Sequence, residues 1–107
     1  MSKPLPHIRI PCSWIRGKGA QLSSKALHLY LVMLSYRDKN TGICYTGQSK
    51  LGELIGVSST RYIRSLIAEL TDLELIWLVV DDDEKSIKSQ YRTNQYYVHD
   101  PMNIHLL

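Results

Sequence analysis

The sequence predicts an α+β fold, in which a group of helices precedes a small set of strands. Apolar residues recur at helical spacing in residues 22–37 and twice within residues 47–76. Residues 76–80 (IWLVV) and 94–98 (NQYYV) have instead the β-branched and aromatic content of strands. The 107 residues, 44% of them hydrophobic, can bury one modest core, so we expect a single globular unit.

The first core helix is expected over residues 22–37, with Ser23 or Ser24 as its cap. Residues 38–42 (DKNTG) have the turn chemistry that ends such a helix. Residues 43–45 (ICY) are long enough for a short strand before Thr46 or Gly47 caps the next helix. The apolar side chains of the first helix are predicted to form one inward stripe: Leu27, Tyr30, Leu31 and Leu34.

Residues 47–76 are read as two short helices joined by a tight turn, which is a helix-turn-helix. Residues 56–59 (GVSS) interrupt the apolar period, and Ser58 or Ser59 caps the second helix. The residues of the two helices that should face the core are Leu51, Leu54, Ile55, Ile63, Leu66, Ile67, Leu70 and Leu73. The order of elements is therefore α, β, α, α, β, β.

The outward face of the second helix predicts DNA binding. It carries Thr60, Arg61, Arg64, Ser65 and Ala68. Arginine pairs bidentately with guanine in the major groove, while serine and threonine bond to bases or phosphates. The expected DNA contacts of the two helices are Gln48, Ser49, Lys50, Ser59, Thr60, Arg61, Arg64 and Ser65. The alternative is that the arginines only keep the surface soluble.

The last two strands and the long polar loop between them form a wing. Within that loop, Lys85, Lys88 and Arg92 are expected to touch phosphates. The acidic run of Asp81, Asp82, Asp83 and Glu84 would either be solvated or bind a basic protein partner or neighbouring copy. Trp77 and Tyr91 would anchor such an interface, or else serve as core or cross-strand partners.

These motifs resemble the winged helix-turn-helix domains of bacterial plasmid and phage replication initiators and of small regulators of mobile elements. The resemblance covers about residues 8–98 and rests on LSSKAL, LYLVML, GICYTGQSKLGELIGVS, IRSLIAEL and TNQYYV. It implies an extended lead-in at residues 7–15 and DNA binding at an origin or operator, without catalytic residues. The family usually has glycine where this chain has Glu74, which implies either a strained residue or a different exit from the helix.

Charge is divided along the chain, whose formal net charge is +3. Residues 1–70 hold ten Lys and Arg against three Asp and Glu, whereas residues 71–107 hold three against seven. The basic part contains the predicted DNA-binding helices, as phosphate binding requires.

Other functional classes have little support in the sequence. Cys12 and Cys44 lack CxxC spacing, so we expect two reduced, mostly buried thiols, and the four histidines lack ligand spacing. We expect no metal or cofactor and no enzyme activity, because no nucleophile motif or carboxylate pair is present. Residues 16–19 (RGKG) are interpreted as a flexible basic turn. With no predicted membrane span or signal peptide, a cytoplasmic protein is expected.

The sequence thus predicts a basic N-terminal arm (1–21), a winged helix-turn-helix domain (22–99) and a C-terminal tail (100–107). The domain would have a three-helix core and a two- to three-stranded wing. The expected function is sequence-specific binding of double-stranded DNA, as a transcriptional regulator or replication-origin binder of a plasmid, phage or other mobile element. The alternative is a protein-interaction module for replication or partition on the same fold.

Self-association is also expected, because one small domain covers only about 1,000 Å² or less of DNA. A homodimer on an inverted repeat would enlarge that footprint. The candidate dimer contact is the apolar tail, which otherwise would pack on its own domain: Met102, Ile104, Leu106 and Leu107.

Overall fold

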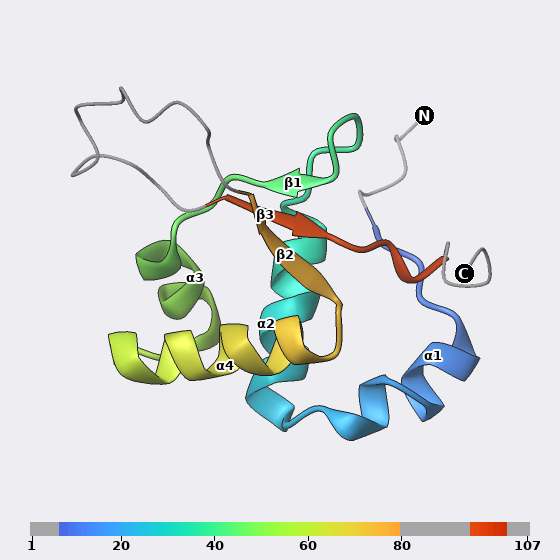
Figure 1. Ribbon diagram of the computed structural model, residues 1–107, viewed down its shortest axis with the longest axis horizontal. Helices are drawn as coiled ribbons and strands as arrows, with labels where there is room; N and C mark the ends of the chain where they lie inside the picture. The colour runs from blue at the N-terminus through green and yellow to red at the C-terminus, as the bar shows by residue number, and fades with distance from the viewer. Residues whose placement is uncertain (1–6, 80–94, 103–107) are drawn as a thin grey trace, which may run out of the picture.

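The computed structural model describes residues 7–79 and 95–102. Its elements are α1 (Cys12–Arg16), the 3₁₀ helix η1 (Gly19–Gln21), α2 (Ser24–Ser35), β1 (Ile43–Cys44), α3 (Gln48–Ile55), α4 (Thr60–Asp72), β2 (Ile76–Val79) and β3 (Gln95–Val98). Figure 1 shows the sheet above the helices, with α3 on one side and α1 on the other. The predicted α+β fold of the winged helix-turn-helix type is confirmed.

The three strands form one antiparallel sheet in the order β1-β3-β2. Ile43 of β1 lies opposite Tyr97, and Ile76 of β2 lies opposite Val98. Successive side chains of a strand point to opposite faces, so Ile76 and Val98 are buried against the helices while Trp77 and Tyr97 are exposed. The rings of Trp77 and Tyr97 pack across the two strands, with centroids 5.6 Å apart. Trp77 thus has a cross-strand partner, as one of its two predicted roles requires.

α2 begins where predicted, but its buried face differs from the predicted stripe. Ser23 caps the helix, since its Oγ accepts a hydrogen bond from the Ala26 amide at 3.3 Å. Of the predicted stripe, Leu27 and Leu31 are only partly buried. The buried residues are Ala26, Leu29, Tyr30, Met33 and Leu34. The helix is apolar around most of its circumference, so periodicity alone did not identify the side that packs on α3 and α4.

The N-terminal region departs most from expectation. The extended lead-in expected at residues 7–15 ends at Pro11, because Cys12–Arg16 is helical, and the basic turn expected at residues 16–19 is confined to residues 17–18, before the 3₁₀ helix Gly19–Gln21. Trp14 of α1 is buried and stacks on Tyr30 of α2, with ring centroids 5.2 Å apart. Burial of this large indole stabilises α1 against the domain, which the short sequence of α1 does not indicate by itself.

The cysteine expectation is right for one residue and wrong for the other. Both thiols are free, and Cys44 is buried in β1. Cys12, by contrast, is exposed at the start of α1. Cys12 precedes the buried Trp14 by two positions, and two steps of an α-helix turn a side chain about 200° away, so the burial of Trp14 does not extend to Cys12.

Candidate nucleic-acid interface

The turn between α3 and α4 depends on a left-handed glycine. Gly56 has φ +76°, and its amide donates to the Glu53 carbonyl at 3.2 Å. The Val57 amide donates to the Gly52 carbonyl at 2.8 Å, which completes a Schellman motif. A Cβ added at Gly52 would lie 2.6 Å from the Val57 carbonyl oxygen, so glycine permits this close approach. The motif reverses the chain and sets the direction of α4.

α4 begins one residue after Ser59, which decides between the two predicted caps. The Ser59 Oγ accepts a hydrogen bond from the Tyr62 amide at 3.2 Å. This hydroxyl therefore satisfies one of the free amides of the helix start. Ser58 makes no such contact and lines the groove between the helices.

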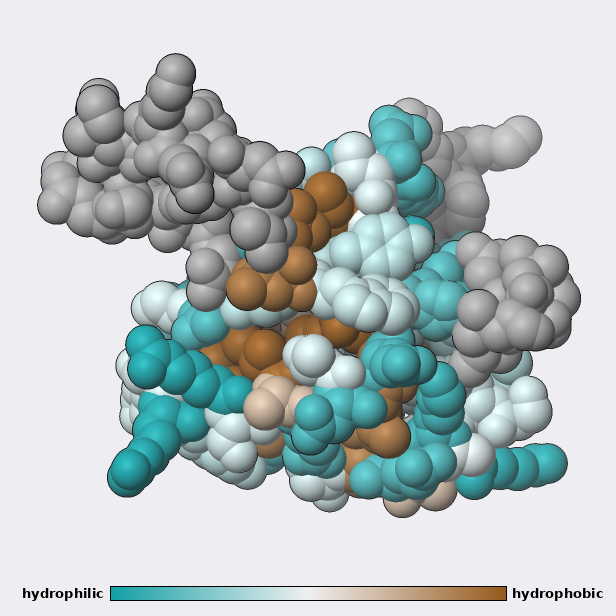
Figure 2. Space-filling view, in the orientation of Figure 1, coloured by the Kyte–Doolittle hydropathy of each residue, from teal (hydrophilic) through white to brown (hydrophobic). Residues whose placement is uncertain are grey.

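The two faces of α4 are divided as predicted. Its buried residues are Ile63, Leu66, Ile67 and Leu70, and Leu73 just beyond the helix is partly buried. The residues predicted to face outward are all exposed: Thr60, Arg61, Arg64, Ser65 and Ala68. Figure 2 shows hydrophilic side chains over the N-terminal half of α4 and hydrophobic side chains between α4 and the sheet.

The basic side chains of this face are free of partners within the described part of the chain. There, Lys50, Arg61 and Arg64 are exposed and make no hydrogen bond or ion pair with another residue. Their charges are therefore available to an external anion. Tyr62 is a further exposed residue of α4 that sequence reasoning missed, with 43% of its surface accessible. Its position next to Arg61, outside the apolar period, was the available signal.

The start of α3 lies beside β3. Gly47 precedes the helix in an extended conformation and provides no side-chain cap. The Gln48 Nε2 donates to the Tyr96 hydroxyl at 2.9 Å, so this predicted DNA contact also joins α3 to the sheet. Ser49 and Lys50 are exposed on the next positions of the helix.

A groove of about 570 Å³ runs along α3 and the turn after it to the start of α4. Gln48, Ser49 and Thr60 line it, so the structure brings these three predicted contacts together. Arg61, Arg64 and Ser65 are not among its lining residues. The predicted contacts are thus distributed over the groove and the adjoining outer face of α4.

Polar contacts at the N-terminus of α2 hold the two helices in place. The backbone amide and Oγ of Ser23 both donate to the Glu69 carboxylate of α4, at 2.6 and 2.9 Å. The Lys25 Nζ donates to the Ile55 carbonyl at the end of α3, at 2.7 Å. These contacts connect residues far apart in the sequence and had no predicted counterpart.

Part of the predicted site lies outside the described residues. This holds for the wing residues Lys85, Lys88, Arg92 and Tyr91, for the acidic run at 81–84, and for the tail residues Ile104, Leu106 and Leu107. Met102 is described and is 41% exposed. Within residues 7–79 and 95–102, no group of three His, Cys, Asp or Glu could hold a metal ion, and no helix is long and apolar enough to cross a membrane.

Comparison with known proteins agrees with this geometry. Residues 20–76 match the family described as a helix-turn-helix domain, which is more than half of the chain. Searches of curated proteins and of solved structures gave no significant match. Helix-turn-helix domains place their second helix in the major groove of DNA, so the match supports DNA as the partner. The chain belongs to this family of helix-turn-helix domains.

Proposed function

We propose that the protein binds double-stranded DNA sequence-specifically by inserting the N-terminal half of α4 into the major groove. The observation that carries the proposal is a pair of exposed arginines opposite the buried face of α4, Arg61 and Arg64, which have no partner in the part of the chain that the structure describes. Arginine bonded to guanine O6 and N7 is the commonest specific contact in that groove. We propose no catalytic role.

Contacts to the phosphate backbone would fix the orientation of α4. Ser49 and Lys50 are exposed on the first turn of α3, beside the groove that Thr60 lines. Contacts of this kind position a protein on DNA without reading its sequence. We assign the same role to Lys85, Lys88 and Arg92, whereas the acidic run at 81–84 would face solvent or a protein partner.

The biological role we propose is that of a transcriptional regulator or a replication-origin binder of a plasmid, phage or other mobile element, acting in the cytoplasm. Two copies would bind an inverted repeat, because one domain covers only about 1,000 Å² or less of DNA. Light scattering tests this pairing. A mass equal to one chain, both free and bound to DNA, would reject it.

The central experiment compares arginine variants on DNA. A binding site is first selected from random duplexes, and Arg61→Ala and Arg64→Ala are then measured on that site and on a scrambled one. Loss of a guanine contact should cost about 1–3 kcal/mol on the selected site and relax the preference at one base pair. Arg16→Ala, which removes an exposed cation of α1, is the matched control. If neither α4 variant changes binding to either duplex, the assignment of this face is wrong.

Salt dependence separates phosphate contacts from base contacts. Each phosphate contact contributes about 0.9 to the slope of log K against log salt concentration. Lys50→Ala should therefore flatten the slope by up to about one unit, and it should weaken binding to the selected and the scrambled duplex equally. An unchanged slope would remove Lys50 from the proposed contacts.

A protein-interaction module is the second candidate. Two aromatic residues on the outer face of the sheet support it: Trp77 and Tyr97 are 42% and 37% exposed. Exposed aromatic residues of this kind commonly anchor protein interfaces. Failure to retard any duplex at low salt would favour this candidate over DNA binding.

A further inference from the structure

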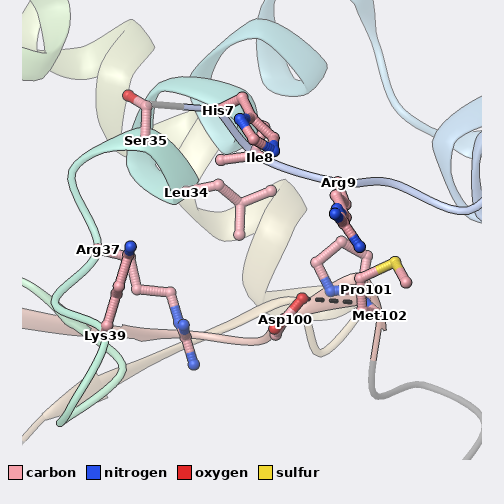
Figure 3. Close-up of a pocket in the computed structure, with 10 residues that line it drawn as sticks. All are labelled: His7, Ile8, Arg9, Leu34, Ser35, Arg37, Lys39, Asp100, Pro101 and Met102. Carbon is pink, nitrogen blue, oxygen red and sulfur yellow. Dashed lines mark hydrogen bonds between the residues drawn. The ribbon is translucent and has the colours of Figure 1, made fainter. Parts of the chain in front are cut away.

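A second hollow lies at the end of the molecule away from α3. This cavity of about 690 Å³ is formed by the residues before α1, the C-terminal end of α2 with the turn that follows, and the residues after β3 (Figure 3). Figure 1 shows the residues before α1 and after β3 on the side opposite α3, with the end of α2 in the middle of the view. The cavity shares no lining residue with the groove between α3 and α4.

The cavity carries more positive than negative side chains. Arg9, Arg37 and Lys39 line it, together with one carboxylate, Asp100. The Arg37 Nε donates to the Val98 carbonyl at 2.8 Å, which holds that guanidinium in place. Among the described residues, the side chains of Arg9 and Lys39 make no hydrogen bond or ion pair. Two cations of the cavity thus have no counterion among residues 7–79 and 95–102.

The acid does not neutralise this excess. The Asp100 Oδ1 accepts a hydrogen bond from the Met102 amide at 3.0 Å, the dashed line in Figure 3. No ion pair joins Asp100 to a cation of the described chain. The carboxylate keeps its charge, so three cations against one acid leave the described lining with a formal excess of two positive charges.

The remaining wall of the cavity is apolar. Leu34 and Pro101 are buried and line it, and the partly exposed side chains of Ile8 and Met102 contribute at its rim. In Figure 3, Leu34 lies between the segment that carries His7 and Ile8 and the segment that carries Asp100 and Pro101. Ligand sites typically combine an apolar lining with a few polar groups that orient the ligand.

We propose that this cavity binds a small organic anion, namely a carboxylate or phosphate ester with an apolar body. The apolar body would contact Leu34 and Pro101, and the charged group would contact Arg9 or Lys39, which lie on opposite sides of Leu34 in Figure 3, through a charge-assisted hydrogen bond. The cavity falls within the range of about 300–1,000 Å³ that is usual for such sites. The proposal does not depend on DNA binding, because the ligand occupies the end of the molecule away from α3.

The experiment is a ¹H–¹⁵N NMR titration of the full chain with hexanoate. Acetate, which lacks the apolar body, and hexan-1-ol, which lacks the charge, are titrated in parallel. Hexanoate should shift the amide signals of Leu34, Arg37 and Met102 and should bind at least tenfold more tightly than either comparison compound. Equal affinities for the three compounds would overturn the proposal.

Variants locate the binding site. Either Arg9→Gln or Lys39→Gln should weaken hexanoate binding about tenfold, since one of the two removes the charged hydrogen-bond partner, and an unchanged affinity in both variants would overturn the proposal. Arg16→Gln removes an exposed cation outside the cavity and should leave the affinity unchanged. An equal loss in Arg16→Gln would indicate only general attraction of anions. Shifts at these amides caused by duplex DNA, and not by hexanoate, would assign the cations to DNA and likewise overturn the proposal.

Discussion

The exits of α3 and α4 use the same motif with different residues. The Glu74 amide donates to the Thr71 carbonyl at 2.9 Å, and the Leu75 amide donates to the Leu70 carbonyl at 3.0 Å. This repeats the Schellman pattern that ends α3 at Gly56. Glu74 accordingly has φ +59°. Of the two alternatives that the sequence left open, the strained residue is the one observed.

Replacing Glu74 with glycine should therefore stabilise the fold. A residue with a Cβ destabilises the folded state by about 1–2 kcal/mol when its backbone is left-handed. Glycine avoids this strain but lowers the free energy of unfolding by about 0.4–1 kcal/mol, because it gives the unfolded chain more conformational freedom. The Glu74 side chain is exposed and has no partner among the described residues, so its loss removes no contact. The expected net gain is about 0.5–1 kcal/mol. This corresponds to a rise of about 2–8 °C in Tm for a domain of this size.

The gain in the free energy of unfolding can be measured by urea and thermal unfolding, with circular dichroism as the signal. Glu74→Ala is the control, because it removes a carboxylate from the negative end of α4 while it keeps the backbone strain. Gly56→Ala is the reverse experiment and should lower the free energy of unfolding by about 1 kcal/mol or more. If Glu74→Gly is no more stable than Glu74→Ala, the strain argument is refuted.

Three further predictions follow from buried groups. Burial lowers the pKa of His99, so the stability present above the unfolded pKa of about 6.5 should be lost as the pH falls below that value. The urea midpoint of His99→Gln should therefore depend less on pH than that of the unaltered protein between about pH 7 and 5. An equal pH dependence in the two proteins would contradict this. Trp14→Ala should cost about 3–5 kcal/mol of unfolding free energy, against about 0.5 kcal/mol or less for the exposed Ile15→Ala, and equal losses would contradict the packing of α1. Cys12 should react with iodoacetamide in the native protein while Cys44 reacts only after unfolding, as mass spectrometry can check; early labelling of Cys44 would contradict its burial.

The elements that could be predicted are those with a single strong signal. α4 has a serine cap at Ser59 and apolar residues at helical spacing from Ile63 to Leu70. Both signals indicate the same helix. The strands were recognisable because β-branched and aromatic residues cluster in β2 and β3. The outward arginines could be assigned because the opposite face of α4 was clearly apolar.

The rest depended on contacts between distant parts of the chain. The buried face of α2 could not be identified from the sequence, because apolar residues occur on more than one side of the helix. Ala26 and Met33 are buried, whereas the equally apolar Leu27 and Leu31 are only partly buried. The packing of Trp14 on α2 is likewise set by tertiary contact, since a five-residue helix has too little periodicity to reveal its inner side. The cations of the cavity come from separate segments, so no local motif marks them.

The two proposed sites are connected through two elements. α2 is tied to α3 and α4 at one end, through Lys25 and Ser23, and lines the anion cavity with Leu34 at the other, about 15 Å along the helix. β3 receives the hydrogen bond from Gln48 at Tyr96, and its last carbonyl receives the one from Arg37. Because only differential contacts can shift an equilibrium between conformations, an anion in the cavity would alter DNA affinity only by displacing α2 or β3.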